Sequence, residues 1–117
     1  MKFVTVTIPG KAVTVGSRIG IADTSLSRLF GLLGKRSLQP GSGILIRPSS
    51  GVHTFGMTFS IDVVALDRDL RVLHLWRRLP PFRVTTIGAR TYSVLELAPG
   101  QIDFCGIEPG DRLMLHD

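Results

Sequence analysis

The chain has little cysteine and no long apolar run. Its 117 residues contain one cysteine, Cys105, which excludes an internal disulfide and a zinc site built on several thiolates. The apolar runs are only a few residues long, whereas a membrane-spanning helix needs roughly twenty. The alternating stretch Phe3–Ile8 is too short and too polar for a signal peptide. We therefore expect a cytoplasmic protein without a membrane partner.

Lysine is scarce as well, with only Lys2, Lys11 and Lys35. The 14 basic residues are therefore mostly arginine, and with 9 acidic residues they leave a net charge of +5 and a sequence pI near 10.4. Such a basic protein favours anionic partners, because the planar guanidinium group matches carboxylate and phosphate. No run of like charge is long enough for an interaction tail, so an ordinary solvated surface is the simpler interpretation.

The length of the chain and the even spacing of its glycines and prolines predict one mainly β domain over residues 1–117. The composition, with 44% hydrophobic residues, is that of a globular domain. Its 13 glycines and 7 prolines separate short β-rich runs, which is typical of a β-sandwich or barrel. The predicted strands are Phe3–Ile8, Ala12–Val15, Arg18–Ala22, Gly43–Ile46, Arg71–Trp76, Thr91–Leu97 and Asp111–His116.

One short helix is predicted at about residues 24–34. Asp23 or Thr24 can cap its start, and Gly34 can end it in the left-handed conformation. Its apolar stripe would consist of Leu26, Leu29, Phe30 and Leu33. A loop or a single helical turn is expected at Gln101–Cys105.

The segment from His53 to Asp67 alternates between two faces. The odd-numbered side chains from His53 to Ala65 would line a core or pocket, while the even-numbered positions hold polar groups up to Asp62. This pattern predicts one long strand, or two strands with a break at Gly56. After Asp62 both faces are apolar, which indicates that this end is covered on both sides.

Several blocks together make the chain resemble the domain of unknown function family 192, a group of small, mostly β prokaryotic proteins. The resemblance implies a compact β-sandwich of jelly-roll character with a short helix, and it implies no established activity, substrate or cofactor. The blocks are Ala22-Asp23-Thr24 with Arg28 and Gly31-Leu32-Leu33, Gly43-Ile44-Leu45-Ile46, Val52-His53-Thr54-Phe55-Gly56-Met57, Ile61-Asp62-Val63-Val64, Leu66-Asp67, Val94-Leu95-Glu96-Leu97 with Gly100, and Gly106-Ile107 with Pro109-Gly110-Asp111.

Two positions depart from this family pattern. Relatives often carry a cysteine shortly before the His-Thr block, where this chain has residues 48–51, so cysteine chemistry beside His53 is not expected. Family hairpins also tend to place glycine at the position of Leu70. Leucine resists a positive φ angle, so the turn here should be strained or of a different type.

A polar cluster within an apolar segment makes ligand binding the leading functional hypothesis. The partner would be a small molecule or an anion, and no cofactor or metal is expected, because the glycines do not form a phosphate loop and the histidines lack a metal-binding spacing. The buried acids in this set should each have a hydrogen-bond donor. The candidate ligand-binding residues are His53, Thr54, Met57, Thr58, Asp62 and Glu96.

Two alternatives remain open. An enzyme could use His53 as a base oriented by Asp62 or Glu96. A nucleic acid could instead bind the segment that mixes aromatic and basic side chains, although an exposed loop with buried aromatic rings is the simpler interpretation. The nucleic-acid candidates are Trp76, Arg77, Arg78 and Arg83, and the ring expected to be buried beside Trp76 is that of Phe82.

Overall fold

The computed structural model describes residues 1–24, 37–49, 51–54, 57–86 and 88–117, and at 51–53, 84 and 86 it describes the backbone alone. The helix predicted at about residues 24–34 therefore lies outside the described residues, apart from Thr24. Among the described residues, no helix is long and apolar enough to cross a membrane.

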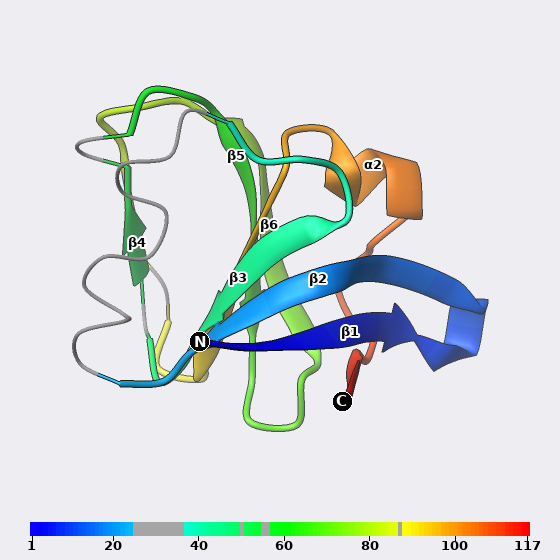
Figure 1. Cartoon of the computed structure of the whole chain (residues 1–117). Coiled ribbons are helices and arrows are strands. Elements are labelled where there is room, and N and C mark those ends of the chain that lie inside the picture. Colours follow the sequence, from blue (N-terminus) through cyan, green and yellow to red (C-terminus); the bar gives the residue numbers. More distant parts are fainter. Residues whose placement is uncertain (25–36, 50, 55–56, 87) are drawn as a thin grey trace.

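The protein is built on one mixed sheet of seven strands (Figure 1). Their order across the sheet is β6-β5-β8-β3-β2-β1-β9. The β2–β3 pair is parallel and every other neighbouring pair is antiparallel. The strands are β1 (Lys2–Ile8), β2 (Val13–Ala22), β3 (Ser42–Ile46), β5 (Ile61–Leu66), β6 (Val72–Leu79), β8 (Ser93–Leu97) and β9 (Met114–His116).

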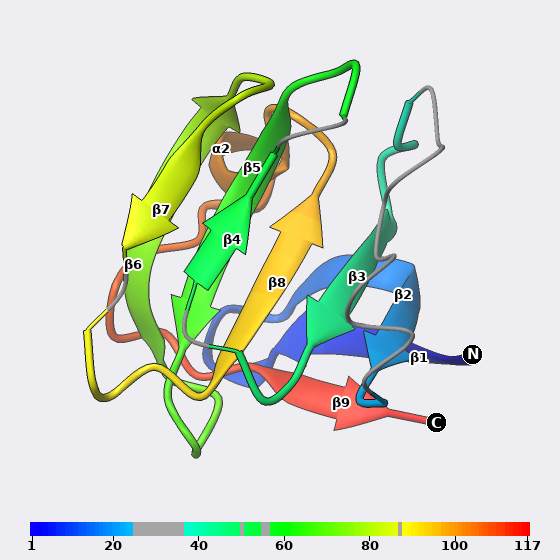
Figure 2. The same ribbon diagram turned by 90° about the vertical axis from the view of Figure 1, so that its left-hand side faces the viewer.

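A second, two-stranded sheet joins β4 (Gly51–His53) to β7 (Val84–Thr86). Figure 2 shows β4 and β7 in front of the large sheet, across the strands β5, β6 and β8. The long alternating segment of the sequence is thus divided between two sheets, because β4 ends at His53 and β5 begins at Ile61.

The mainly β class is confirmed, but the large sheet is open, and the described residues show no jelly-roll-like barrel. Its edge strands β6 and β9 do not pair with each other. Only one isolated bridge, between Arg71 and Arg112, links the start of β6 to the segment before β9. Two further backbone bonds, from Val72 N to Asp111 O and from Leu113 N to Leu70 O, hold this segment in place.

The predicted strands are found with changes at their ends. The main difference is β2, a single strand over Val13–Ala22 where two were expected. The extra residues lie in β2 itself, since the β1–β2 register shifts on both sides of Val6 and each shift leaves β2 with one residue more than β1. The expected turn at Gln101–Cys105 is a short α-helix, α2, which ends at Gly106 with φ +67°. A 3-10 turn, η1 (Pro9–Lys11), joins β1 to β2.

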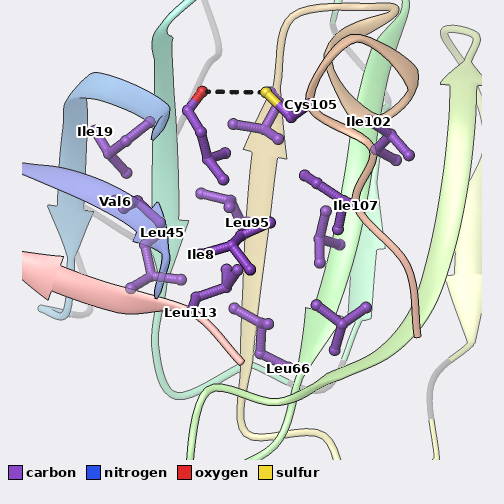
Figure 3. Packing of buried hydrophobic residues seen from close by; sticks show 14 of the residues in the cluster. Val6, Ile8, Ile19, Leu45, Leu66, Leu95, Ile102, Cys105, Ile107 and Leu113 are labelled. Carbon is purple, nitrogen blue, oxygen red and sulfur yellow. Dashed lines mark hydrogen bonds between the residues drawn. The ribbon is translucent and has the colours of Figure 1, made fainter. Parts of the chain in front are cut away.

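The large sheet has a hydrophobic core on each side. One core includes Ile102 and Cys105 of α2 together with Leu45, Leu66 and Leu95 of the sheet (Figure 3). The other core holds six buried residues, namely Ala22, Ile44, Met57, Ile61, Val63 and Val94. We call the face that carries this second core the Glu96 face, after the acid described below.

Candidate functional site

Glu96 lies in the middle of the large sheet with apolar neighbours on both sides. In the register, it is opposite Ile44 of β3 and Val63 of β5. Directly opposed residues of neighbouring strands project from the same face, so the Glu96 side chain belongs to the face that holds the second core. The residue is 5% exposed. Burial raises the pKa of its carboxyl group to about 7.

The Glu96 carboxyl group makes no hydrogen bond or ion pair with the part of the chain that the structure describes. Around it are the aliphatic side chains of the second core, with Trp76 and Phe59 packed against that core from its margin. An ionised carboxylate in such surroundings is strongly destabilising, and the shifted pKa expresses this cost. Of the two acids singled out in the sequence, Glu96 is the one for which the described residues provide no donor.

Asp62 lies on the opposite face and does have donors. It is fully buried and faces Leu97 of the first core in the register. Its Oδ1 accepts a bond of 2.9 Å from Arg78 N, and its Oδ2 accepts one of 2.8 Å from Ile102 N. The carboxylate therefore joins the end of β6 to the start of α2. Because Asp62 and Glu96 project from opposite faces, the structure does not bring these two acids together.

Thr54 and Met57 have structural contacts. Thr54 is fully buried, and its hydroxyl donates to Pro80 O at 2.7 Å and accepts from Arg83 N at 2.8 Å. It therefore holds the loop between β6 and β7. Met57 is 5% exposed and belongs to the second core, so it shares the Glu96 face. Thr58, in contrast, is exposed.

For His53 the structure describes only the backbone, which pairs with Val84 across the small sheet. The hypothesis of a base at this position therefore lies outside the described side chains. Within the described residues, no three His, Cys, Asp or Glu side chains gather in a way that could hold a metal ion.

The basic segment at the end of β6 is more exposed than the sequence suggested. Phe82 was expected to be buried, but it is 66% exposed, whereas Trp76 is half-buried. Arg78 and Arg83 are exposed. Arg77 forms an ion pair with Asp103 of α2, with Nε and Oδ1 2.7 Å apart. Of the guanidinium groups of Arg77, Arg78 and Arg83, that of Arg77 is therefore engaged in a salt bridge.

Two open surface pockets among the described residues lie away from the predicted ligand-binding residues. One, of about 860 Å³, is lined by the turn at Pro9 and by residues 69–70 and 110–115. The other, of about 350 Å³, is lined by Pro48, Ser49, Arg68, Thr91 and Tyr92. None of these five residues is among the ligand-binding residues predicted from the sequence. The polar triplet at residues 91–93, which opens an apolar strand, was the only signal for this pocket.

The sequence of this chain is similar to those of known archaeal proteins. A UPF0127 protein of Thermococcus sibiricus is 35% identical over 105 residues, which is 82% of this chain and 64% of the relative. The chain thus spans less than two thirds of that relative's length. A UPF0127 protein of Pyrococcus horikoshii is 32% identical over 98 residues, covering 81% of this chain and 84% of the relative.

Solved structures share the fold. A protein of unknown function from Novosphingobium aromaticivorans superposes with a TM-score of 0.81 at 24% identity, over 96% of this chain and 83% of the other. A candidate transcription regulator from Sinorhizobium meliloti superposes with a TM-score of 0.76 at 20% identity, over 98% of this chain and 96% of the other. A family model described as "Uncharacterized ACR" matches residues 4–115.

Proposed function

The chain belongs to the DUF192 family, and from its buried acid we propose that it binds a small molecule on the Glu96 face, with the Glu96 carboxyl group as the polar anchor. The observation that carries the proposal is a carboxyl group 5% exposed that has no hydrogen-bond partner in the described structure. Perturbed, buried titratable groups of this kind gather at functional sites.

The contrast with Asp62 supports a functional role for Glu96. Both acids are buried in the same sheet. Where the role is structural, at Asp62, two backbone N–H groups satisfy the carboxylate. At Glu96 the described chain supplies no donor, so a bound molecule that supplies one would remove an unfavourable interaction.

The surroundings indicate the chemistry of the ligand. Ile44, Val63 and Met57 share the Glu96 face and would contact its apolar part. The carboxyl group would accept a hydrogen bond from an amine, amide or hydroxyl group of the ligand. We therefore propose a small, mainly apolar molecule with one hydrogen-bond donor, lying against the large sheet on the side of β4 and β7 (Figure 2). Thr54 and Asp62 are outside this proposal, because the Thr54 hydroxyl bonds to the loop between β6 and β7 and Asp62 projects from the opposite face of the sheet.

NMR titration with matched probes tests the proposal. Benzylamine and benzyl alcohol carry a donor, and benzyl methyl ether has the same apolar ring without one. We expect saturable shifts of the β3, β5 and β8 amides around Glu96 with the two donors, and binding about tenfold weaker for the ether, the typical effect of one buried polar group left unpaired. In Glu96→Leu this preference should disappear.

The matched control is Glu108→Leu, because Glu108 is an exposed acid outside the Glu96 face. This variant should keep the wild-type preference for the donor probes. Equal binding of all three probes, no saturable binding, or an unchanged preference in Glu96→Leu would each contradict the proposal.

A second candidate function is nucleic-acid binding by the loop after β6. It is favoured by the 66% exposure of Phe82 beside the exposed Arg83, since stacked bases and neutralised phosphates need accessible aromatic and basic side chains. Fluorescence anisotropy with a mixed single-stranded oligonucleotide should give an affinity that falls at least tenfold between about 50 and about 200 mM salt. Arg83→Ala should weaken binding, and the distant Arg18→Ala should not. Absence of binding at low salt would remove this candidate.

A further inference from the structure

A small pocket is located at the end of the large sheet where β3 and β5 finish and β8 begins. Its volume is about 350 Å³, and its walls are Pro48, Ser49, Arg68, Thr91 and Tyr92. Two backbone bonds of 2.8 Å, from Ser49 N to Tyr92 O and from Tyr92 N to Leu66 O, join the three chain segments. The walls of the pocket are therefore fixed by the ends of the sheet itself.

Arg68 supplies the positive charge of this pocket. Its guanidinium carbon lies 4.4 Å from the centroid of the Tyr92 ring, an arrangement that orients the planar group. Arg68 forms no ion pair with any acid in the described part of the chain. The neighbouring Asp67 is already engaged, because its Oδ1 accepts bonds from the backbone N–H groups of Asp69 and Arg71.

Thr91 supplies an unpartnered hydroxyl group. The residue is only 9% exposed, and its Oγ1 has no hydrogen-bond partner within the described structure. Buried hydroxyl groups in folded proteins nearly always have a partner, since an unpaired one is destabilising. This oxygen exposes less than 1 Å² to solvent, so a bound molecule would reach it only after the Thr91 side chain rotates toward the pocket. The hydroxyl group would then donate to an oxygen atom of that molecule the hydrogen bond that the protein leaves unmade.

We propose that this pocket binds the carboxylate group of a small molecule, with the Arg68 guanidinium and the Thr91 hydroxyl as its two recognition groups. A guanidinium group pairs with the two oxygens of a carboxylate in a planar, bidentate geometry. Arg68 is the one charged side chain among the lining residues that the structure describes, so this part of the pocket matches one negative charge better than the two of a phosphate. This pocket would bind a hydrogen-bond acceptor, the ligand's carboxylate, whereas Glu96 would bind a ligand group that donates a hydrogen bond. The two proposals therefore stand or fall independently.

An NMR titration of the whole chain with sodium acetate tests this site, with sodium chloride at equal ionic strength as the reference. We expect saturable amide shifts centred on Ser49, Arg68 and Tyr92. Arg68→Gln should abolish them, and Thr91→Val, which keeps the side-chain shape, should weaken binding about tenfold, as for other hydrogen bonds to charged groups. The matched control is Arg18→Gln, which removes a guanidinium group from the Phe3 ring, 4.3 Å away, outside the pocket.

Three results would overturn the proposal. The first is an absence of saturable shifts with acetate beyond those of chloride. The second is acetate binding that persists unchanged in both Arg68→Gln and Thr91→Val. The third is saturable binding of inorganic phosphate but not of acetate, which would contradict the assignment to a carboxylate.

Discussion

Glu96 and Asp62 are buried to nearly the same degree, at 5% and 0% exposure, but their environments have opposite energetic consequences. Asp62 is satisfied by two backbone donors. Glu96 is opposed by desolvation alone, which raises its pKa from 4.5 to about 7. A proton therefore stays on Glu96 in the folded protein over a pH range in which the unfolded chain has released it. Folding stability must then decrease as the pH rises through that range.

The first prediction concerns this pH dependence. Glu96→Gln carries an amide that does not titrate, so it should match the wild type near pH 4.5 and exceed it above pH 7. The difference should reach about 3 kcal/mol, since one pKa unit corresponds to about 1.4 kcal/mol. Urea denaturation at several pH values measures this difference in the free energy of unfolding. Parallel stability profiles for the two proteins would contradict the shifted pKa, and Glu108→Gln serves as the exposed control.

A second residue-level prediction concerns Leu70. The sequence predicts a turn here that is strained or of a different type, and Leu70 does have a φ of +64°, which strains a leucine. Its side chain packs against the first core. Leu70→Ala should lose the packing and keep the strain, whereas Leu70→Gly loses the packing and relieves the strain. We therefore expect the glycine variant to be about 1 kcal/mol more stable than the alanine variant by thermal denaturation, the reverse of the usual order in strands. The control is Leu75 in β6, where the alanine variant should be more stable than the glycine variant.

Between elements, single side chains join segments that the sheet does not pair. Asp62 links β6 to α2, so Asp62→Ala should leave the N–H groups of Arg78 and Ile102 unpaired. A destabilisation of about 3 kcal/mol is expected from two lost bonds to a charged group. Asp62→Asn keeps one acceptor oxygen and should lose about half as much. Chemical denaturation measures both, and equal losses would contradict a role for both oxygens.

Parts of the elements and of the site could be predicted from the sequence. Ile61 and Val63 of β5 do share one core, because a period of two reports which residues of a strand share a face, and Met57 joins the same core from outside the strand. The same period does not report the strand's partner, so the change from the small sheet to the large one after His53 could not be seen. The need of Asp62 for donors was predictable, but its separation from Glu96 was not, since long-range strand register decides it.

For the whole molecule, strand order predicts a gradient of local stability. β8 is paired on both sides, with β3 and β5, whereas β6 and β9 are the edge strands of the large sheet. Amides of β8 should exchange with solvent only through global unfolding, and those of β9 through local opening at much lower free energy. Native-state hydrogen exchange in low denaturant checks this. Equal protection of β8 and β9 would contradict the strand order.

The two cores on either side of the large sheet have a consequence for how the protein can diversify. Val63 and Val64 are consecutive residues, but they belong to different cores. Free-energy effects add where two sites share no partners and stop adding where a substitution shifts a shared backbone, so conservative changes that leave the β5 backbone in place should act nearly independently on the two cores. If Glu96 binds a ligand as proposed, that side of the molecule can accumulate changes in ligand specificity, while the core on the α2 side keeps the stability that tolerates them. Divergence of ligand preference among homologues would then be expected to leave the α2 side largely unchanged.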